Sequence, residues 1–456
     1  MSAPALQRIA GWSSTLTLEA VPDEVRGVAR ACFIDTLGVA LAGSRTEVAR
    51  RAQAVATVVG APGACAVLGA DARLAAPSAA FANATAAHAL DFDDNCYAGV
   101  VHGSAVIVPA AFAMAQAVNA SGAELLTAFI AGSEAEYALG SAATMSLYDR
   151  GWWTTGVLGP IGAAAAAARL LGLTANATAS ALGIALAGTG GAKAAFGTDA
   201  KPLLAGRAAE AGIIAALLAA NGASGPHDAA EHKRGFAGLF NGGVFDPVAF
   251  GSLGTQWRLL DPGIDIKRIP VCLSSHAAVD AVVELVARNG VPLNDIVSIV
   301  CDVPPIVIAN LIHDRPATKQ QAQFSMPFAV AVSLRFGDLT LAHLDDALVN
   351  DPALVALMAK VEMVTGPTWD DPAALRAAPE GAYVRLELRD GTVLTGYRAF
   401  PRGAAASPLS AAEIDAKFLG CTAHVPDADA LLLRLHALET LPALRDLIAS
   451  PVQETL

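Results

Sequence analysis

The sequence predicts a mainly α-helical protein, with a large all-helical domain and a smaller α+β lid domain. Three observations predict this class. Ala-rich apolar segments recur between residues 20 and 250; apolar residues reach 54% of the chain and charged ones only 16%; and strand-like alternation begins only after residue 264. Because 456 residues exceed the usual size of one hydrophobic core, two domains are expected.

The first domain is predicted from repeated apolar, helix-forming segments. Alanine is the strongest helix former, and small side chains let helices approach closely. These segments are apolar on most faces, so several helices should be buried all round. In order they are EVRGVARACFIDTLGVALAG, SAVIVPAAFAMAQAVNASG, GAELLTAFIAGSEAEYALGSAA, GPIGAAAAAARLLGL and GRAAEAGIIAALLAANG.

The second domain is predicted over residues 266–400. SIVCDVPP is typical of a strand, and YVRLELRDGTVLTGYRA alternates polar and apolar residues around Asp390-Gly391, which predicts a β-hairpin. SSHAAVDAVVELVARNG predicts a helix before this strand, and FSMPFAVAVSLRFG predicts one between the strand and the hairpin. Residues 401–456 return to helix and should complete the helical domain of residues 1–265, with a pocket in the cleft between the domains.

Composition excludes several classes of function. The net charge of −12 disfavours binding to nucleic acid. Charged residues or proline interrupt the apolar stretches before about 20 residues, so no membrane segment is expected, and the N-terminus has no apolar signal region. The six cysteines are scattered, which fits a reduced cytoplasm and argues against disulfides and a zinc site. The glycine-rich GTGGAKAAFG follows no β-run, so it does not predict a dinucleotide site.

The stretch HALDFDDNCYAGVVHG, residues 88–103, concentrates polar groups in apolar surroundings. Asp91, Asp93 and Asp94 lack the alternating spacing of a calcium loop, which disfavours a metal site. A hydrogen-bonded aspartate at a helix end is the simpler interpretation of any one of them. His102 begins an apolar helix, where it could be a neutral acid or base, a carboxylate anchor, or a packed helix-start histidine.

Three further segments carry candidate groups. In GWWTTG, Thr154 or Thr155 could cap the next helix, and the two tryptophans could line a pocket or fill the core. Lys201, with Arg207 six residues later, could bind carboxylates, or could be a solvated loop lysine. In KRIPVCLSSHAAVD, two serines at helix-cap positions, Ser274 and Ser275, put His276 in the first helical turn. There the helix dipole would keep the imidazole neutral, as a general base.

Five motifs occur in order along the chain: AAHALDFDD with a following histidine, G-x-x-x-TG with GAAAAAARLLGL, KPLLAGRAAEAG, IPVCLSSHAAVDA and QFSMPFAVAVSL. Together they resemble the MmgE/PrpD family, which includes 2-methylcitrate dehydratase, cis-aconitate decarboxylase and iminodisuccinate epimerase. The resemblance implies a helical domain made from both chain ends, a smaller α+β lid, a homodimer, and no metal or organic cofactor.

The resemblance also implies roles for four residues. The family's pocket aspartate falls on Asp91, its loop histidine on His102, its lysine on Lys201 and its second histidine on His276. His102 and His276 would be the acid/base pair, Lys201 the charge anchor, and Asp91 would orient a histidine. Asp93 and Asp94 would be structural.

Other positions depart from the family's pattern. Trp153 and Thr154 replace a usual histidine and proline, Asn95 replaces a threonine, Gly103 replaces a proline, and Phe328 replaces a tyrosine of decarboxylating members. The changes at Trp153 and Phe328 weaken a cis-aconitate decarboxylase assignment. The expected substrate-binding residues are Asn95, Trp153, Thr155, Arg207, Ser275 and Phe328.

The expected function is therefore that of a cofactor-free lyase similar to 2-methylcitrate dehydratase, acting on a small di- or tricarboxylate through a carbanion or enolate. Decarboxylation and epimerisation are the alternatives on the same fold. An alternative of another class is a family member that binds a ligand without catalysis. An iron–sulfur hydro-lyase is disfavoured because the cysteines do not cluster.

Overall fold

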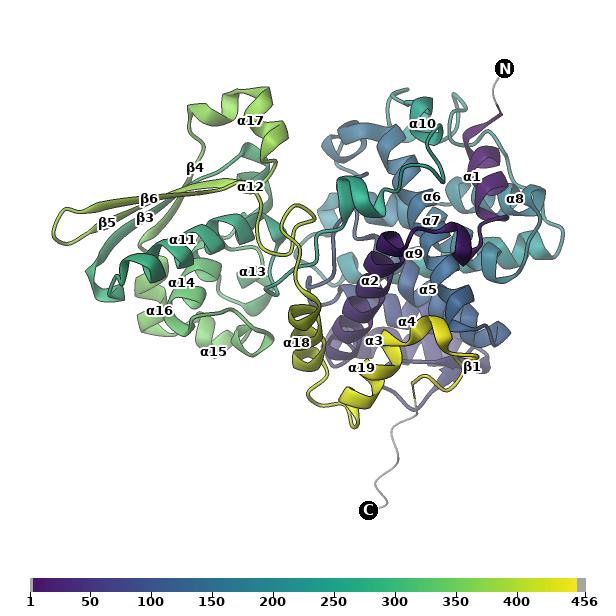
Figure 1. The fold of residues 1–456 in the computed structure, drawn as a ribbon, viewed down its shortest axis with the longest axis horizontal. Coiled ribbons are helices and arrows are strands. Elements are labelled where there is room, and N and C mark those ends of the chain that lie inside the picture. The colour runs from purple at the N-terminus through teal and green to yellow at the C-terminus, as the bar shows by residue number, and fades with distance from the viewer. Residues whose placement is uncertain (1–2, 449–456) are drawn as a thin grey trace, which may run out of the picture. The chain divides into compact units, whose positions relative to one another are not determined.

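The structure is a computed structural model and describes residues 3–448. It divides into two compact units. The first contains the described residues up to Ile266 and those from Ser410 onward, and the second contains Lys267–Leu409. The described chain is mainly helical, as predicted, with a few short strands (Figure 1). That the second unit acts as a lid stays a prediction.

The first unit is built from helices at both ends of the chain. The Ala-rich segments form the predicted helices, and α18 and α19 contact α2, as expected for a returning C-terminal segment. Two short strands, β1 (Pro62–Ala66) and β2 (Arg73–Leu74), pair antiparallel. The helices are α1 (Ala5–Ser13), α2 (Asp23–Gly43), α3 (Glu47–Val59), α4 (Ala76–His88), α5 (Gly103–Val118), α6 (Gly122–Asp149), α7 (Thr154–Leu170), α8 (Ala175–Ala187), α9 (Ala200–Ala220), α10 (Phe236–Phe240), α18 (Ala411–Cys421) and α19 (Ala428–His436).

Helix α9 packs against both α4 and α7 through small residues. A Cβ on Gly206 of α9 would lie 2.3 Å from the Thr85 hydroxyl and 2.5 Å from the Phe81 carbonyl of α4. A Cβ on Gly212 would lie 2.4 Å from Ala163 of α7. Glycine is therefore required where the backbone of α9 touches its neighbours. This close packing holds in place the ends of α4, α7 and α9, where polar residues of the candidate site are found.

Helix α9 is long and apolar enough to cross a membrane, judged by length and composition only. Half of its most apolar 18-residue window is buried in the structure. Core helices of globular proteins show the same property, since a helix that is apolar on most faces is buried by its neighbours.

The second unit combines a four-stranded sheet with helices. The strand order is β4-β3-β5-β6, with β3 and β4 parallel and the other pairs antiparallel. Helix α11 contacts β5 and β6, and α14 contacts α11 and β4, so apolar side chains fill the space between the helices and the sheet. The elements are β3 (Ile296–Asp302), β4 (Val361–Val364), β5 (Ala382–Leu388), β6 (Val393–Arg398), α11 (His276–Asn289), α12 (Pro305–Asn310), α13 (Lys319–Ala322), α14 (Met326–Phe336), α15 (Asp346–Val349), α16 (Pro352–Met358) and α17 (Pro372–Ala377).

The β-hairpin predicted around Asp390-Gly391 is confirmed. Val384 pairs with Gly396 and Leu386 with Leu394 across β5 and β6. Gly391 has φ 84°, a left-handed conformation that glycine adopts without a Cβ penalty. The predicted strand in SIVCDVPP is β3, whereas β4 was not predicted because only four residues of it pair.

Candidate active site

The candidate site is organised by the loop that joins α4 to α5. Helix α4 ends at His88, and α5 begins at Gly103 with His102 as its N-cap residue, so the prediction that His102 begins a helix is confirmed. Asp91 and Val100 have positive φ values, 49° and 54°. A β-branched residue such as valine rarely adopts this conformation. The surrounding contacts must therefore hold the loop in place.

Two backbone bridges hold the loop. Cys96 N–H donates to the Val101 carbonyl at 2.8 Å, and Val101 N–H donates back at 2.9 Å. Asn95 and Asp265 exchange backbone hydrogen bonds in the same way, both at 2.9 Å. Asn95 therefore joins the loop to the segment before Ile266 through its main chain, and a substrate contact from its side chain stays a prediction.

The threonines of GWWTTG also hold the loop. The Thr154 hydroxyl donates to the Val100 carbonyl, and the Thr155 Oγ1 accepts the His102 backbone N–H at 2.9 Å. Both are the first residues of α7, whose N-cap is Trp153. The prediction that one threonine caps α7 is therefore wrong, because both hydroxyls bond to the loop instead.

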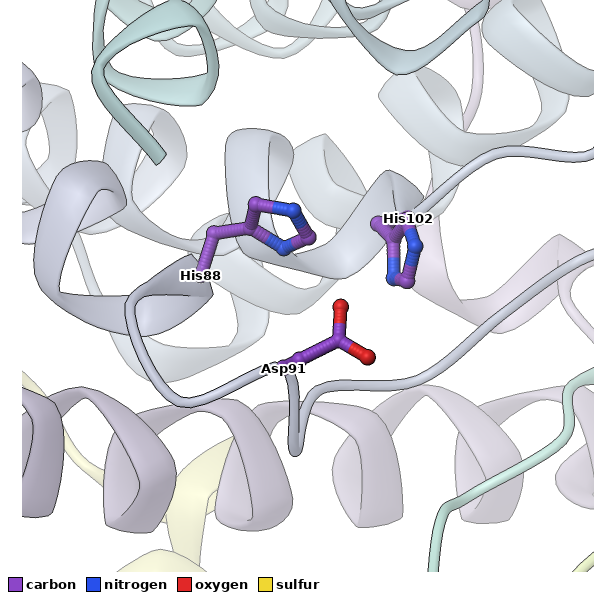
Figure 2. A group of neighbouring side chains, drawn as sticks. All are labelled: His88, Asp91 and His102. Atoms are coloured by element: carbon purple, nitrogen blue, oxygen red, sulfur yellow. The ribbon is translucent and has the colours of Figure 1, made fainter. Parts of the chain in front are cut away.

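Asp93 lies between two histidines. Its Oδ2 is 2.8 Å from His88 Nδ1 and 3.0 Å from His102 Nδ1. The two imidazole rings meet edge to face with centroids 4.6 Å apart. The His88 and Asp93 side chains are fully buried, whereas the His102 side chain is 14% exposed. Figure 2 shows the two rings with Asp91 beside them. His102 is thus the imidazole of this cluster that solvent can reach.

Charges differ sharply within this cluster. Burial acts to raise the pKa of Asp93, but attraction and hydrogen bonds from His88 and His102 outweigh it and hold that pKa well below its usual range. Burial lowers the pKa of His88, although Asp93 opposes the change. At neutral pH the arrangement is therefore an ionised carboxylate with a neutral His88 on one side and His102 on the other.

Lys201 forms a second charged contact with the same loop. Its Nζ lies 2.6 Å from Asp91 Oδ1, and both side chains are more than nine-tenths buried. Lys201 is the second residue of α9 rather than a loop residue, and it is 6% exposed, so the solvated-lysine interpretation is wrong. The phenyl ring of Phe196 lies 5.1 Å from the ammonium group. The ion pair joins α9 to the loop beside the two histidines.

The two tryptophans of GWWTTG have different surroundings. Trp153 is 2% exposed, belongs to the core of the first unit, and has its ring 5.3 Å from the His88 ring. Trp152 stacks on Phe240 and donates its indole N–H to the Phe240 carbonyl at 2.9 Å. Trp153 therefore forms an apolar wall behind His88, and a direct contact with substrate stays a prediction.

Arg207 does not lie in this cluster. The Arg207 side chain is 70% exposed and pairs with Glu210 at 2.5 Å, so it is a surface group rather than a clamp beside Lys201. Ser275, His276 and Phe328 belong to the second unit. Phe328 is fully buried in the core between helices and sheet, where its backbone N–H donates to Ser325 Oγ.

His276 is the first residue of α11, as predicted, and is 1% exposed. Its Nε2 lies 3.1 Å from the Val271 carbonyl, which identifies Nε2 as the protonated nitrogen. Ser275 is the N-cap residue of α11, as expected, but neither serine hydroxyl accepts a capping hydrogen bond from the helix. Ser275 donates to the Cys272 carbonyl at 2.9 Å, and Ser274 donates to Glu380 at 2.9 Å.

Buried carboxyl groups lie behind the loop. Burial raises the pKa of Asp94 to about 7 and that of Glu134 to about 7. Burial also raises the pKa of Glu136 to about 8, and its two carboxyl oxygens have no hydrogen-bond partner among the described residues. The pKa values of the adjacent Asp93 and Asp94 carboxyls therefore shift in opposite directions, since the imidazoles of His88 and His102 stabilise the anion at Asp93.

One atom each of His88, Asp91 and His102 could act as a ligand, and these atoms lie within 4.8 Å of one another. Two imidazoles and a carboxylate could bind a transition metal. The Lys201 ammonium, however, already neutralises Asp91 at 2.6 Å. We therefore assign no metal to these residues and describe a direct test below.

Sequence reasoning missed His88 and underestimated Asp93. The sequence assigned no role to His88, and Asp93 was expected to be structural. The spacing in HALDFDD could have indicated their contact, because the helix ends at His88 and a tight turn then brings Asp93 back to it five residues later. Nothing in the spacing distinguished Asp93 from Asp91 as the partner of the imidazoles.

Comparison with known protein families settles what kind of chain this is. The MmgE/PrpD N-terminal domain matches residues 7–247, and the MmgE/PrpD C-terminal domain matches residues 269–438. The chain belongs to the MmgE/PrpD family. The resemblance read from the five motifs is thereby confirmed.

Relatives of this family member carry the name of one reaction. The chain is 29% identical to a cis-aconitate decarboxylase of Homo sapiens over 87% of this chain and 83% of that protein. It is 27% identical to a cis-aconitate decarboxylase-like protein, oryM, of Aspergillus oryzae over 93% and 91%. It is 26% identical to a cis-aconitate decarboxylase of Aspergillus terreus over 98% and 96%. The similarity thus spans nearly the whole of each chain.

Proposed function

We propose that this protein is a cofactor-independent lyase that acts on a small di- or tricarboxylic acid by acid–base chemistry. The observation that carries this proposal is the cluster at the α4–α5 loop. There a partly exposed imidazole, His102, contacts an ionised carboxylate, Asp93, beside the buried pair of Lys201 and Asp91. Family membership and the enzyme names of the relatives support it.

Each group has a role in such chemistry. Loss of water begins when a base takes a proton from the carbon beside a carboxylate, and it ends when hydroxide leaves with a proton from an acid. Loss of carbon dioxide leaves the bonding electron pair on carbon, and an acid then protonates that carbon. Either path passes through a carbanion or enolate, which a nearby cation stabilises. His102 would move the proton, and Lys201 would hold a substrate carboxylate.

The second acid or base is proposed to be His276, as the family resemblance implies. Asp91, bonded to Lys201, would fix the direction of the ammonium group rather than bind substrate itself. A metal or organic cofactor is not part of the proposal. The substrate contacts of Asn95, Trp153, Thr155, Ser275 and Phe328 remain proposals as well, as do a homodimeric assembly and a cytoplasmic location.

Two reactions have support. The names of the relatives favour decarboxylation of an unsaturated tricarboxylic acid. The replacements at Trp153 and Phe328 favour a different acid or dehydration, because they change side chains that decarboxylating members are expected to use. At position 153 a tryptophan stands where the family pattern has a histidine, and its ring packs against that of His88.

One experiment separates these reactions. The purified protein is incubated in deuterated water with a panel of di- and tricarboxylic acids, including cis-aconitate and 2-methylcitrate, and followed by NMR. Release of carbon dioxide identifies a decarboxylase, loss of water a dehydratase, and deuterium exchange with inversion an epimerase. If no acid changes while some acids bind, the protein is a ligand-binding member of the family and the proposal is wrong.

A further inference from the structure

We propose that Asp93 and His88 are positioning residues for His102, with Asp93 setting its tautomer and charge and His88 moderating that effect. The inference rests on the proposed role of His102 and deepens it. Family resemblance supplied roles for Asp91, His102, Lys201 and His276, but none for His88 and only a structural one for Asp93. The argument therefore depends on the contacts of these two residues alone.

The tautomer of His102 follows from its neighbours. Its Nδ1 lies 3.0 Å from Asp93 Oδ2 and 3.1 Å from the Asp94 carbonyl oxygen. Both atoms are hydrogen-bond acceptors, since the Asp93 carboxyl is ionised. A nitrogen between two acceptors must carry the proton, so Nδ1 is N–H and the lone pair of neutral His102 is on Nε2. Nε2 is then the atom that can take a proton from substrate.

Asp93 also favours positive charge on His102. An ionised carboxylate within hydrogen-bond distance stabilises an imidazolium over an imidazole. The Asp93 side chain is fully buried, so water screens this attraction little. When Nε2 takes a proton, the new charge lies beside a fixed anion. Asp93 thereby makes His102 a stronger base and holds its ring in one direction.

His88 limits this effect because it shares the same oxygen. Its Nδ1 lies 2.8 Å from Asp93 Oδ2, and an ionised acceptor makes this nitrogen a donor as well. A carboxylate oxygen that already accepts one N–H attracts a second donor less strongly. The Nε2 of His88 is buried and has no hydrogen-bond partner among the described residues, which fits a neutral ring held only through Nδ1. His88 therefore reduces the pull of Asp93 on His102.

Other titratable groups surround this cluster and must be kept constant. Asp91 of the loop and Lys201 of α9 lie beside the histidines, and the buried carboxyls and phenol behind the loop are Asp94, Glu136 and Tyr137. None of them is changed in the variants below. Their contribution to the pH dependence is then the same in every protein compared.

The test uses substitutions with opposite expected effects. Asp93→Asn removes the anion, so the acid-side limb of the kcat/KM profile should move to lower pH by about 1 unit or more. Its kcat should fall about 10²- to 10⁴-fold, because an amide can also donate to Nδ1 and select the wrong tautomer. His88→Phe removes the competing donor but keeps a ring against Trp153, so the same limb should move to higher pH.

Two variants serve as controls. His88→Asn offers an amide N–H near the position of Nδ1 and should restore a limb close to that of the wild type. Asp23→Asn makes the same chemical change as Asp93→Asn at a side chain that is 90% exposed, and it should leave the profile unchanged. Circular dichroism and thermal unfolding confirm that each variant is folded. If Asp93→Asn does not fold, the comparison of His88→Phe and His88→Asn with the wild-type protein still provides the test.

A second readout does not depend on turnover. With ¹⁵N-labelled histidine, NMR should show His102 and His88 of the wild type as Nδ1–H tautomers and should follow protonation of His102 directly. An Nε2–H tautomer at His102, or limbs that shift in the same direction for Asp93→Asn and His88→Phe, would overturn the inference. If the NMR result holds but no acid is converted, the proposed function fails and the positioning role stands.

Discussion

The two histidines proposed as the acid/base pair both lie at the start of a helix but have different hydrogen-bond partners. His102 is the N-cap of α5, and His276 is the first residue of α11. His102 turns Nδ1 toward a buried carboxylate at 3.0 Å, whereas His276 turns Nε2 toward a neutral carbonyl at 3.1 Å. Two histidines near helix starts therefore have opposite tautomers.

This difference shows what sets the chemistry of a histidine. The dipole at a helix N-terminus disfavours imidazolium in both cases. For His102, the ionised carboxylate of Asp93 at 3.0 Å offsets that effect, whereas the His276 contact described above is with a neutral carbonyl. The contact with Asp93 thus favours proton uptake by His102 in the proposed reaction. Pairs of groups whose surroundings favour different protonation states are typical of acid–base sites.

The largest expected effect comes from removing the imidazole next to the carboxylate. His102→Ala should lower kcat/KM at least about 10²-fold, within the range of about 10²–10⁴ for one general acid or base. The His102 side chain is partly exposed, so the variant should remain folded by circular dichroism. Turnover similar to the wild type in a folded variant would remove His102 from the mechanism.

His276 should give a loss of similar size if the comparison describes a true pair. His276→Gln keeps an N–H near the position of Nε2, so the bond to Val271 can persist while the titrating group is lost. His276→Gln should therefore lower kcat/KM about 10²-fold or more. His276→Ala also loses the hydrogen bond to Val271, which should lower the free energy of unfolding by about 1 kcal/mol. Full activity of His276→Gln would show that His276 is structural only.

Lys201 is predicted to matter for both binding and stability. Lys201→Met leaves Asp91 buried without its cation, which should cost about 3–5 kcal/mol in urea unfolding and weaken substrate binding. The double variant Lys201→Met/Asp91→Leu removes both charges, so stability should recover while binding does not. Recovery of both would mean that the ion pair holds the loop but does not contact substrate.

Glu136 provides an effect on stability, and its direction depends on pH. The folded-state pKa of Glu136, about 8, lies above its ordinary value of 4.5. The contribution of the protonated carboxyl to folding stability is therefore complete below pH 4.5 and is lost as the pH rises through about 8. Glu136→Gln removes this proton linkage. Relative to the wild type, the variant should be more stable at pH 8.5 than at pH 5, by about 4 kcal/mol in the difference. A pH-independent difference would contradict the burial of this carboxyl.

The smallest expected effect is that of metal removal. Because Lys201 already neutralises Asp91, dialysis against a chelator should leave activity unchanged, and elemental analysis should find far less than one metal per chain. The Asp23→Asn variant, taken through the same dialysis, shows how much activity is lost through handling alone. Stoichiometric zinc or iron whose removal abolishes activity would replace the acid–base proposal with metal chemistry at His88, Asp91 and His102.

Most of the fold could be predicted because it depends on local signals. The Ala-rich helices and the hairpin at Asp390-Gly391 follow from residue propensity and period, which neighbouring residues determine. The four-residue β4 has too short a pattern, since its place in the sheet depends on pairing with β3, which is distant in sequence.

The candidate site was only partly predictable for the same reason. His102 and Lys201 could be named because they interrupt apolar segments. The choice between Asp91 and Asp93 depends on which way each side chain turns in a loop with two positive φ values. The use of Thr154 and Thr155 depends on the approach of a loop 54 and 53 residues away in sequence. Arg207 was overestimated because sequence alone does not show that it faces solvent.

The glycine contacts of α9 have a consequence for variation far from the cluster. Helix α4 ends at His88, and α9 carries Lys201 in its first turn, so the two helices present their site residues from packed backbones. A methyl group at Gly206 would collide with α4 at 2.3 Å and 2.5 Å, one turn and a half beyond Lys201. Natural variants of this protein should therefore tolerate bulk on the exposed faces of α9 far better than at Gly206.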